Sequence, residues 1–247
     1  GQSCDMKAIS KLGEKYNFRI IEDAAHAIGA SYLNKNVGSC QYSDITVFSF
    51  HPVKVITTGE GGAALTNNLE VAKKMQLLRS HGITRDSKEM TNSIVSDWYY
   101  EQISLGFNYR MTDFQAALGI SQLSRLDEYV AKRSKIAHWY DDQFENIPVN
   151  SLIQKESGES SYHLYVIRVK NREGERDRLY KYLRKGGIYV NLHYIPIYRQ
   201  PFFNRKIRLL GAEEYYKSAI SLPIFPTIGK NNLKKVVQKI SEFYEYH

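Results

Sequence analysis

A single lysine stands out because of the residues on both sides of it. Lys54 follows an apolar run at 45–50, which is rich in β-branched and aromatic residues and predicts a strand. A proline precedes the lysine, and glycines within 59–62 turn the chain back into a second apolar run. Desolvation in such a loop would lower the pKa of the amine and free its lone pair for nucleophilic attack. Taken alone, the segment also fits a hairpin that carries an exposed lysine.

An aspartate upstream changes how this lysine is interpreted. Asp23 ends another apolar run, within the sequence EDAAHA at 22–27. Two neighbouring strand ends, one offering an aspartate and the other a lysine, are what a pyridoxal phosphate (PLP) site requires. The lysine holds that cofactor as a Schiff base, and the aspartate pairs with the pyridinium nitrogen. The competing interpretation of Asp23 is a helix cap or a surface carboxylate.

The surrounding pattern predicts the elements that must position these two residues. Apolar residues at helical spacing predict a helix over 6–16, capped by Ser3 or Asp5, and a short buried strand is expected at 18–22. Alternating helices and strands favour an α/β architecture, whose ligands gather at the carboxyl ends of the strands. A helix is also expected at 69–79.

A long amphipathic helix is expected after Thr112, which can serve as its N-cap. Periodicity assigns its apolar stripe to the core: Phe114, Ala117, Leu118, Ile120, Leu123 and Leu126. Residues 83–101 are polar and aromatic with weak periodicity, so we expect a loop that lines the substrate or a neighbouring subunit.

The C-terminal part of the sequence predicts a small α+β unit. A strand is expected at 162–169, a charged helix at 173–185 that stops at two glycines, and a short apolar strand after them. Helices at 212–220 and 231–246 close the chain.

Composition excludes some classes of protein. With 247 residues and 43% hydrophobic content, the chain can bury a substantial core in one or two domains. The formal net charge of +8 comes from scattered residues, so we expect attraction for an anionic small substrate rather than nucleic-acid binding. Cys4 and Cys40 make no disulfide framework or metal motif, which fits a reducing cytoplasm. We see no signal peptide and no apolar run long enough to span a membrane.

Six motifs, in order along nearly the whole chain, resemble one known family. They are EDAAHA at 22–27, SFHPVK at 49–54, TTGEGG at 57–62, GFNYRMTD at 106–113, HYIP at 193–196 and AISLP at 219–223. On these motifs the sequence resembles the DegT/DnrJ/EryC1/StrS family of sugar aminotransferases. Within that family it is most similar to the branch that aminates C4 of a UDP-4-keto-6-deoxy-sugar in pseudaminic acid synthesis.

The resemblance implies an α/β fold, the PLP-dependent aminotransferase fold type I. Residues 1–125 would be the remaining part of a large PLP-binding domain with a mostly parallel sheet. Residues 126–247 would be a linking helix and a small α+β domain. The chain opens where family members are already well into their large domain, so we expect an N-terminal portion of roughly a third of a full-length chain to be absent.

The resemblance also assigns roles to individual residues. Lys54 would hold the cofactor and shuttle a proton, and Asp23 would keep the pyridine nitrogen protonated. Ser49 would donate its hydroxyl to the cofactor phosphate. His26 would lie near the ring, although a satisfied core histidine is the competing interpretation. Asn108 would contact the cofactor phosphate of a partner subunit, so that the active site lies at the interface of a homodimer.

A second group of residues is implied to contact the substrate. His193 and Tyr194 resemble the family's sugar-contacting loop, and Arg199 would meet a nucleotide phosphate unless it is a surface arginine. The implied reaction moves an amino group from glutamate, which becomes 2-oxoglutarate, to the C4 keto group of a UDP-4-keto-6-deoxy-HexNAc sugar nucleotide. Two alternatives stay open: an aminoarabinose- or perosamine-type nucleotide-sugar aminotransferase, and an inactive fragment or binding relative of the family.

Overall fold

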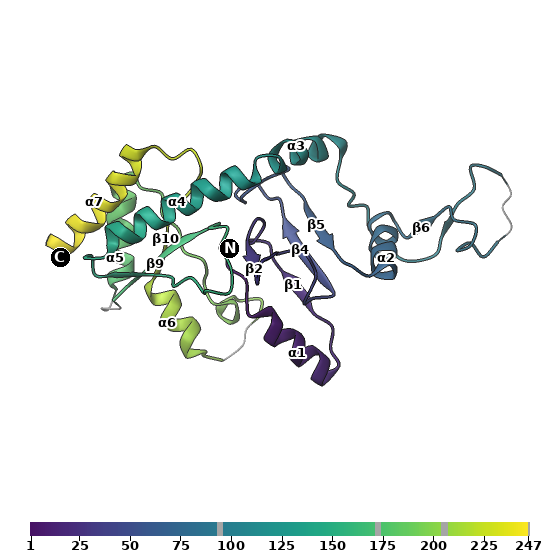
Figure 1. The fold of residues 1–247 in the computed structure, drawn as a ribbon, viewed down its shortest axis with the longest axis horizontal. Helices are drawn as coiled ribbons and strands as arrows, with labels where there is room; N and C mark the ends of the chain where they lie inside the picture. The colour runs from purple at the N-terminus through teal and green to yellow at the C-terminus, as the bar shows by residue number, and fades with distance from the viewer. Residues whose placement is uncertain (93–95, 171–173, 204–206, 247) are drawn as a thin grey trace. The chain divides into compact units, whose positions relative to one another are not determined.

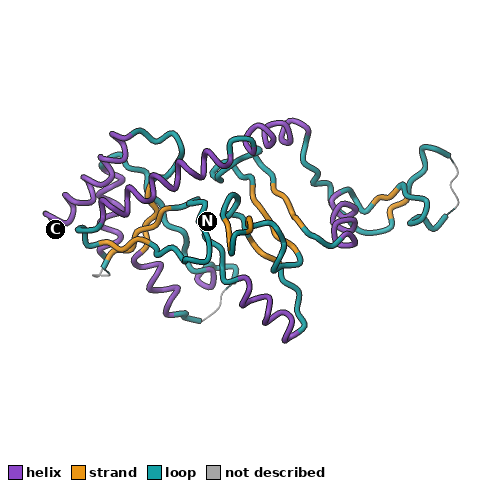
Figure 2. The backbone as a smooth tube through the Cα atoms, viewed as in Figure 1, coloured by secondary structure: helices purple, strands orange, loops and turns teal. Residues whose placement is uncertain are grey.

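The computed structural model describes residues 1–92, 96–170, 174–203 and 207–246 (Figures 1 and 2). It divides into two compact units. Ser3–Arg125 form the first, here called the N-terminal unit, and Leu126–His247 with Gly1–Gln2 form the second, here called the C-terminal unit. Both combine helices with small sheets, so each is mixed in its secondary structure.

The N-terminal unit is built on a three-stranded sheet in the order β1-β4-β5. β1 (Ile21–Asp23) pairs in parallel with β4 (Ile45–Ser49), and β5 (Gly62–Leu65) pairs antiparallel with β4. Figure 2 shows these strands lying side by side. The sheet is therefore mixed rather than mostly parallel as predicted, because β5 returns along β4 in the opposite direction; its parallel pair is formed by β1 and β4, which carry the predicted site.

The helices that flank this sheet begin where local signals place them. α1 (Met6–Tyr16) starts after Asp5, whose side chain accepts the N–H of Ala8 at 3.1 Å. It ends at Asn17, which adopts the left-handed conformation. α2 (Leu69–Arg79) also occupies its predicted range. Capping side chains within three residues thus mark where these two helices begin, and at α1 the hydroxyl of Tyr32 also donates to the Asp5 carboxylate at 2.7 Å.

The chain segment that connects β1 to β4 contains two further strands, which form a hairpin. They are β2 (Ser31–Tyr32) and β3 (Lys35–Asn36). The strand expected at 18–22 starts later than predicted, because the N–H of Ile20 donates to the carboxylate of Asp44 at 2.8 Å rather than to a neighbouring strand.

The loop expected at 83–101 contains a small sheet. β6 (Ile83–Thr84) pairs antiparallel with β7 (Glu101–Gln102), and Figure 1 shows β6 beyond α2, away from the β1-β4-β5 sheet. The carboxylate of Glu101 accepts the backbone N–H groups of Thr91 and Asn92 at 2.7 and 2.9 Å. These bonds hold the pKa of Glu101 at about 2. Three residues of this expected loop, 93–95, lie outside the described residues.

The long helix expected after Thr112 is two helices. Thr112 caps α3 (Asp113–Leu123) through a capping box with Gln115, and α4 (Leu126–Phe144) then begins the C-terminal unit. The apolar stripe predicted to be core is not buried: none of the residues of α3, all of which the structure describes, is buried, and Phe114 is 91% exposed. The prediction was wrong because helical periodicity identifies an apolar face but not what covers it.

The C-terminal unit is an antiparallel sheet covered by helices. Its strands, in the order β10-β9-β8, are β8 (Val149–Ser151), β9 (Tyr165–Val169) and β10 (Ala219–Leu222). Its helices are α4, α5 (Glu175–Lys185), η1 (Ile197–Arg199), α6 (Leu210–Ser218) and α7 (Lys230–Tyr246). The core lies where these elements meet, around the fully buried side chains of Ile167, Leu179, Leu183, Ile220 and Ile240.

Several boundaries in this unit differ from the prediction. The helix expected at 212–220 ends at Ser218, because the apolar residues that follow pair with β9 as a strand. Apolar runs this short fit a helix or a strand equally, and only the pairing decides between them. The strand expected after the two glycines is reduced to a single bridge between Asn191 and Ser221. Residue 173 of the expected helix at 173–185 lies outside the described residues.

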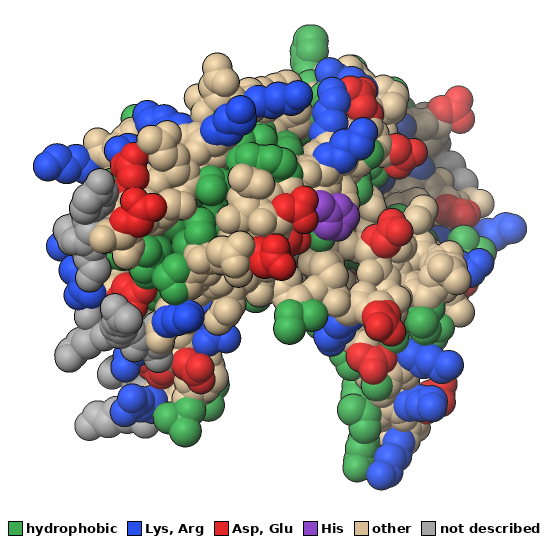
Figure 3. All heavy atoms as spheres, turned by 60° about the vertical axis from the view of Figure 1, so that its left-hand side comes forward, with side chains coloured by type: hydrophobic (Ala, Val, Ile, Leu, Met, Phe, Trp, Pro, Cys, Tyr) green, Lys and Arg blue, Asp and Glu red, His purple; other side chains and the backbone are tan. Residues whose placement is uncertain are grey.

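Charged side chains of both signs cover the surface shown in Figure 3. Lys and Arg are spread over this face together with Asp and Glu, so its described part shows no single basic patch. Among the described residues, none of the helices combines the length and the apolar character needed to cross a lipid bilayer.

One buried arginine joins distant parts of the C-terminal unit. The Nη1 group of Arg133, on α4, donates to the carbonyls of Tyr162, His163 and Ile224 at 3.1, 3.3 and 2.9 Å. Arg133 is 5% exposed, and no ion pair joins it to a carboxylate of the described chain. Burial lowers its pKa to about 10. The carbonyl dipoles therefore stabilise the positive charge of Arg133 in place of a counter-ion.

We expect Arg133→Met to lower the free energy of unfolding by about 3–5 kcal/mol, because three buried carbonyls lose their donor. Urea denaturation followed by circular dichroism measures this loss. The matched control is Lys132→Met, next to it on the exposed side of α4, which should change stability by no more than about 0.5 kcal/mol. Equal effects of the two substitutions would contradict this account of Arg133.

Candidate active site

The parallel pairing of β1 with β4 brings two chain segments to one edge of the sheet. Ile21 lies opposite Ile45, and Asp23 lies opposite Val47. The pairing continues past the strand, since the N–H of Ala24 donates to the carbonyl of Val47 at 2.9 Å. Parallel strands have their carboxyl ends at the same edge, so the residues after β1 and those after β4 emerge together. This edge is the candidate active site.

The chain after β4 forms a closed loop that carries Lys54. The N–H of Phe50 donates to the carbonyl of Gly61 at 2.8 Å, which ties the loop at its base. Within the loop, the N–H of Lys54 donates to the carbonyl of His51 at 2.9 Å. The two residues that follow the lysine are buried. These contacts hold the lysine at the sheet edge.

Lys54 has the electrostatic setting of a reactive amine. It is partly buried, and burial lowers the pKa of its ammonium below the ordinary value. The negative charge of Asp23 acts in the opposite direction, with a smaller effect. The structure thus brings these two predicted site residues within electrostatic reach of each other. Their roles toward a cofactor stay predictions.

Asp23 is the last residue of β1, and His26 lies in the turn that follows the strand. Asp23 is exposed, and its Oδ1 accepts the N–H of Ala25 at 3.1 Å, which orients the carboxylate in that turn. This bond lies within a turn and caps no helix, so of the competing interpretation only the exposed carboxylate is observed. It leaves the carboxylate at the sheet edge, and His26 is half-buried beside it in sequence.

Ser49 is the last residue of β4, so its hydroxyl also lies at this edge. Its Oγ accepts the N–H of His51 at 3.4 Å. The Nε2 of His51 lies 3.7 Å from Oε1 of Glu60, near the base of the loop. The predicted contact of Ser49 with a phosphate stays a prediction.

The two glycines after Glu60 serve the packing of the protein itself. Gly61 has a φ of 152°, a conformation that favours glycine. A Cβ on Gly62 would lie 2.6 Å from the carbonyl oxygen of Phe48 in β4. Close approach of the neighbouring strand is therefore sufficient to require glycine at 62, without any ligand.

Asn108 is presented on a segment that is held firmly. The N–H of Phe107 donates to the carbonyl of Leu78 at 2.8 Å, and Asn108 forms a bridge with Ser80 just after α2. Residues 107–110 are nevertheless all exposed. An ordered backbone with an exposed asparagine suits contact with another molecule, and the predicted partner subunit stays a prediction.

The remaining predicted residues lie in the C-terminal unit. His193 Nδ1 lies 2.7 Å from the hydroxyl of Ser221, and Tyr194 is 62% exposed. Arg199 is ion-paired with the buried carboxylate of Glu213, to which its Nε donates at 2.8 Å. Arg199 is thus more than a free surface arginine, and its predicted contact with a nucleotide phosphate stays a prediction.

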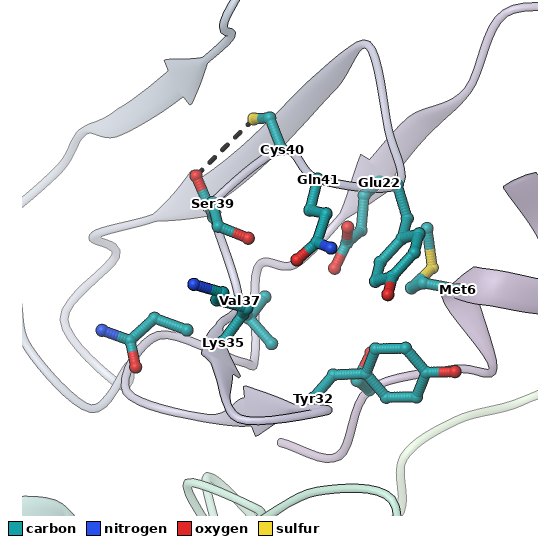
Figure 4. A pocket seen from close by; sticks show the side chains of 12 residues that line it. Met6, Glu22, Tyr32, Lys35, Val37, Ser39, Cys40 and Gln41 are labelled. Carbon is teal, nitrogen blue, oxygen red and sulfur yellow. Dashed lines mark hydrogen bonds between the residues drawn. The ribbon is translucent and has the colours of Figure 1, made fainter.

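A small pocket in the N-terminal unit is separate from these residues. Figure 4 shows Met6, Glu22, Tyr32 and Gln41 around it. Burial raises the pKa of Glu22, and none of the predicted site residues lines the pocket. Successive strand residues point to opposite faces, so Glu22 and its neighbour Asp23 serve different surroundings.

Sequence reasoning missed residues that act as buried partners. Ser221 lies within hydrogen-bond distance of His193, and Glu213 is paired with Arg199. Glu101 accepts hydrogen bonds from the backbone between β6 and β7. Ser221 falls within a motif that carried the family resemblance, which was its available signal. Glu213 and Glu101 had none, because a glutamate in a helix or strand is ordinary until its partners are known.

The sequence of the chain is similar to those of one known family. The profile of the DegT/DnrJ/EryC1/StrS aminotransferase family matches residues 1–241. The UDP-4-amino-4,6-dideoxy-N-acetyl-beta-L-altrosamine transaminase of Campylobacter jejuni subsp. jejuni serotype O:23/36 (strain 81-176) is 39% identical over 256 residues, covering 99% of this chain and 65% of that protein. The chain thus spans just under two thirds of the length of this curated relative.

Solved structures show the same likeness. Helicobacter pylori PseC, an aminotransferase involved in the biosynthesis of pseudoaminic acid, superposes with a TM-score of 0.90 at 32% identity, covering 99% of this chain and 64% of that one. The putative sugar aminotransferase Spr1654 from Streptococcus pneumoniae, in its PMP form, has a TM-score of 0.88 at 28% identity, covering 99% and 67%. The predicted α/β fold, type I of the PLP-dependent aminotransferases, is confirmed.

We expect the Lys54 amine to react with acetic anhydride at lower pH than the amine of Lys239. Burial lowers the pKa of Lys54, so more of it is neutral at a given pH, whereas a 2.6 Å hydrogen bond to Glu242 raises the pKa of Lys239. Pulse labelling of the cofactor-free protein over a range of alkaline pH, read by mass spectrometry, gives both titrations.

The substitution Asp23→Asn sharpens this test. It removes the charge that opposes the effect of burial, so the pKa of Lys54 should fall further while that of Lys239 stays where it is. A Lys54 titration that coincides with that of Lys239 would contradict the effect of burial, and one that is unchanged by Asp23→Asn would show that the two site residues do not interact.

Proposed function

The chain belongs to the DegT/DnrJ/EryC1/StrS aminotransferase family, and we propose from this that it forms the lysine-bearing part of a PLP-dependent nucleotide-sugar aminotransferase. One observation carries the proposal: a partly desolvated lysine amine, in the loop after β4, lies within electrostatic reach of the aspartate that ends the parallel strand β1. The PMP and PLP forms of the Streptococcus pneumoniae relative support the same cofactor.

The residues at the sheet edge fit the cofactor. When bound, PLP supplies an aldehyde that a lysine amine can capture and a pyridine ring that withdraws electrons. Lys54 offers an amine whose pKa is lowered by burial, Asp23 a carboxylate for the ring nitrogen, and Ser49 a hydroxyl for the phosphate. The donor set is therefore of the right chemistry for this group.

Each side chain would then contribute one physical effect. The amine of Lys54, once neutral, can take a proton from the reacting carbon and return it, and such positioned acid–base catalysis contributes about 10²–10⁴-fold. The carboxylate of Asp23 holds a proton on the ring nitrogen, because an adjacent negative charge favours the protonated form. His26, half-buried in the turn after β1, would pack beside the ring or hydrogen-bond its hydroxyl.

We propose as substrate a UDP-4-keto-6-deoxy-HexNAc sugar nucleotide, aminated at C4, with glutamate as donor. The name of the Campylobacter jejuni relative supports a UDP-4-amino-4,6-dideoxy sugar as product, and that of the Helicobacter pylori structure supports the pseudaminic acid pathway. His193 and Tyr194 would contact the sugar. A cytoplasmic location is part of the proposal, because Cys4 and Cys40 are both free thiols.

We also propose a homodimer in which Asn108 serves the partner's site. Its side chain is exposed while its backbone is held against the end of α2. An exposed asparagine on a hydrogen-bonded backbone can bond an atom of a second subunit with little cost for ordering the backbone. This supports the exchange of residues between subunits that the family resemblance implies.

The complete protein loaded with PLP should show the absorbance band of a lysine-bound cofactor, and Lys54→Ala should abolish it. The reason is that only an amine can bind the aldehyde covalently. Lys239→Ala, in α7 of the C-terminal unit, is the control and should leave the band intact. If the band persists in Lys54→Ala, another lysine holds the cofactor. A panel of UDP- and GDP-keto-sugars then identifies the substrate by rate.

Mixed dimers test the role of Asn108. Subunits carrying Lys54→Ala and subunits carrying Asn108→Ala are each expected to be nearly inactive alone. Mixed in equal amounts they should regain about a quarter of wild-type activity, because half the dimers then hold one site with an intact Lys54 and the partner's intact Asn108. Replacing Asn108→Ala by the exposed Asn231→Ala gives the control. Failure to regain activity would place Asn108 in its own subunit's site.

A further inference from the structure

A buried carboxylate in α6 gathers the residues that follow the HYIP motif. Glu213 is 4% exposed. Its Oε1 accepts the hydroxyl of Tyr198 at 2.9 Å and the Nε of Arg199 at 2.8 Å, and its Oε2 pairs with the Nη2 of Arg199. Such a two-pronged pairing of arginine with carboxylate fixes orientation as well as distance. The end of the segment 193–199 is therefore attached to α6.

Neighbouring groups reinforce this attachment. The guanidinium of Arg199 lies over the ring of Tyr216, 5.3 Å from its centroid, and Arg176 lies 4.8 Å from the same ring. Arg176 also donates to the carbonyl of Tyr216 at 2.8 Å. Burial raises the pKa of Glu213, but the bonds from Tyr198 and Arg199 outweigh it, so the net pKa lies below the usual value. The carboxylate is therefore held in its charged form.

The beginning of the same segment is attached to β10. Asn191 and Ser221 exchange backbone hydrogen bonds at 2.9 and 3.2 Å, and the Nδ1 of His193 lies 2.7 Å from the hydroxyl of Ser221. β10 follows α6 directly, since the helix ends at Ser218 and the strand begins at Ala219. One continuous piece of chain therefore holds both ends of the segment 193–199.

Between these two attachments three side chains are exposed, while Pro196 is buried. Tyr194 is 62% exposed, Ile195 48% and Ile197 63%, whereas Tyr198, bound to Glu213, is 7% exposed. An exposed aromatic and aliphatic group on a backbone held at both ends is what a preorganised contact surface needs, because little freedom is lost when a ligand binds. The segment is built to present Tyr194 and its neighbours.

We propose that Glu213 is a positioning residue that, through Arg199 and Tyr198, fixes the segment 193–199 so that it can contact the nucleotide sugar. The recognition part of this inference rests on the proposed function. Arg199 then contributes by holding the segment in place, and the surface it helps to fix determines how well the sugar nucleotide binds.

Hydrogen exchange of the complete protein tests the attachment. The amides of Arg199 and Gln200 donate to the carbonyls of Pro196 and Ile197 at 2.9 and 3.0 Å. In Glu213→Gln and in Arg199→Gln these amides should exchange about tenfold faster than in the wild type. The matched control is Glu214→Gln, the next residue of α6, which pairs with Arg168 and should leave both amides unchanged.

Kinetics of the same variants test recognition. Glu213→Gln and Arg199→Gln should each raise KM for the UDP-4-keto-6-deoxy sugar about tenfold, with kcat and the KM for glutamate changed by less than about twofold. The double variant should be no worse than either single one, because both remove the same attachment. Glu214→Gln should match the wild type.

The outcomes separate the two proposals. Unchanged exchange in both Glu213→Gln and Arg199→Gln overturns the attachment, and Arg199→Gln keeps the test open if Glu213→Gln does not fold. Faster exchange with an unchanged KM for the sugar, or with a loss confined to kcat, overturns the recognition role. A wild type that aminates none of the keto-sugars refutes the proposed function and with it the recognition role, while the exchange data still decide the attachment.

Discussion

The candidate active site depends on the parallel hydrogen-bonded pairing of β1 with β4. This pairing sends the chain after Asp23 and the chain after Ser49 in the same direction, so the aspartate and the loop with Lys54 meet at one edge. Antiparallel pairing of the same two strands would place them at opposite edges. Register matters as much, because side chains alternate between faces. A slip by one residue would turn Asp23 to the face that Glu22 now occupies.

Local signals were sufficient for features that depend on a few neighbouring residues. α1 and α2 occupy their predicted ranges, since in each case a capping side chain lies within three residues of the amides that it binds. The sequence was insufficient to predict the structure of segments whose conformation or burial depends on residues far away in the chain. Residues 219–222 are apolar enough to continue α6, and only pairing with β9 makes them a strand. The stripe of α3 shows the same limit, because periodicity cannot say what contacts an apolar face.

Among the site residues, too, those with a local sequence signal could be predicted and those that depend on distant partners could not. Asp23 and Lys54 could be found because each adjoins a strand that its own sequence predicts, and sheet geometry then brings strand ends together. Glu213 offered no such signal, since its two partners lie 15 and 14 residues upstream and meet it only in the folded unit. Buried polar partners of this kind can be identified only from the tertiary structure, which shows which charged groups are buried and what they bond.

The attachment of Arg133 to three carbonyls has a consequence for biogenesis. Its farthest acceptor, Ile224, lies 91 residues downstream. Synthesis proceeds from the N-terminus, so α4 leaves the ribosome well before that acceptor exists. A guanidinium buried early would lack part of its hydrogen bonding, which is costly away from water. Completion of the C-terminal unit is thereby coupled to translation of its final segment, and a nascent chain stalled before residue 224 would keep that charge hydrated.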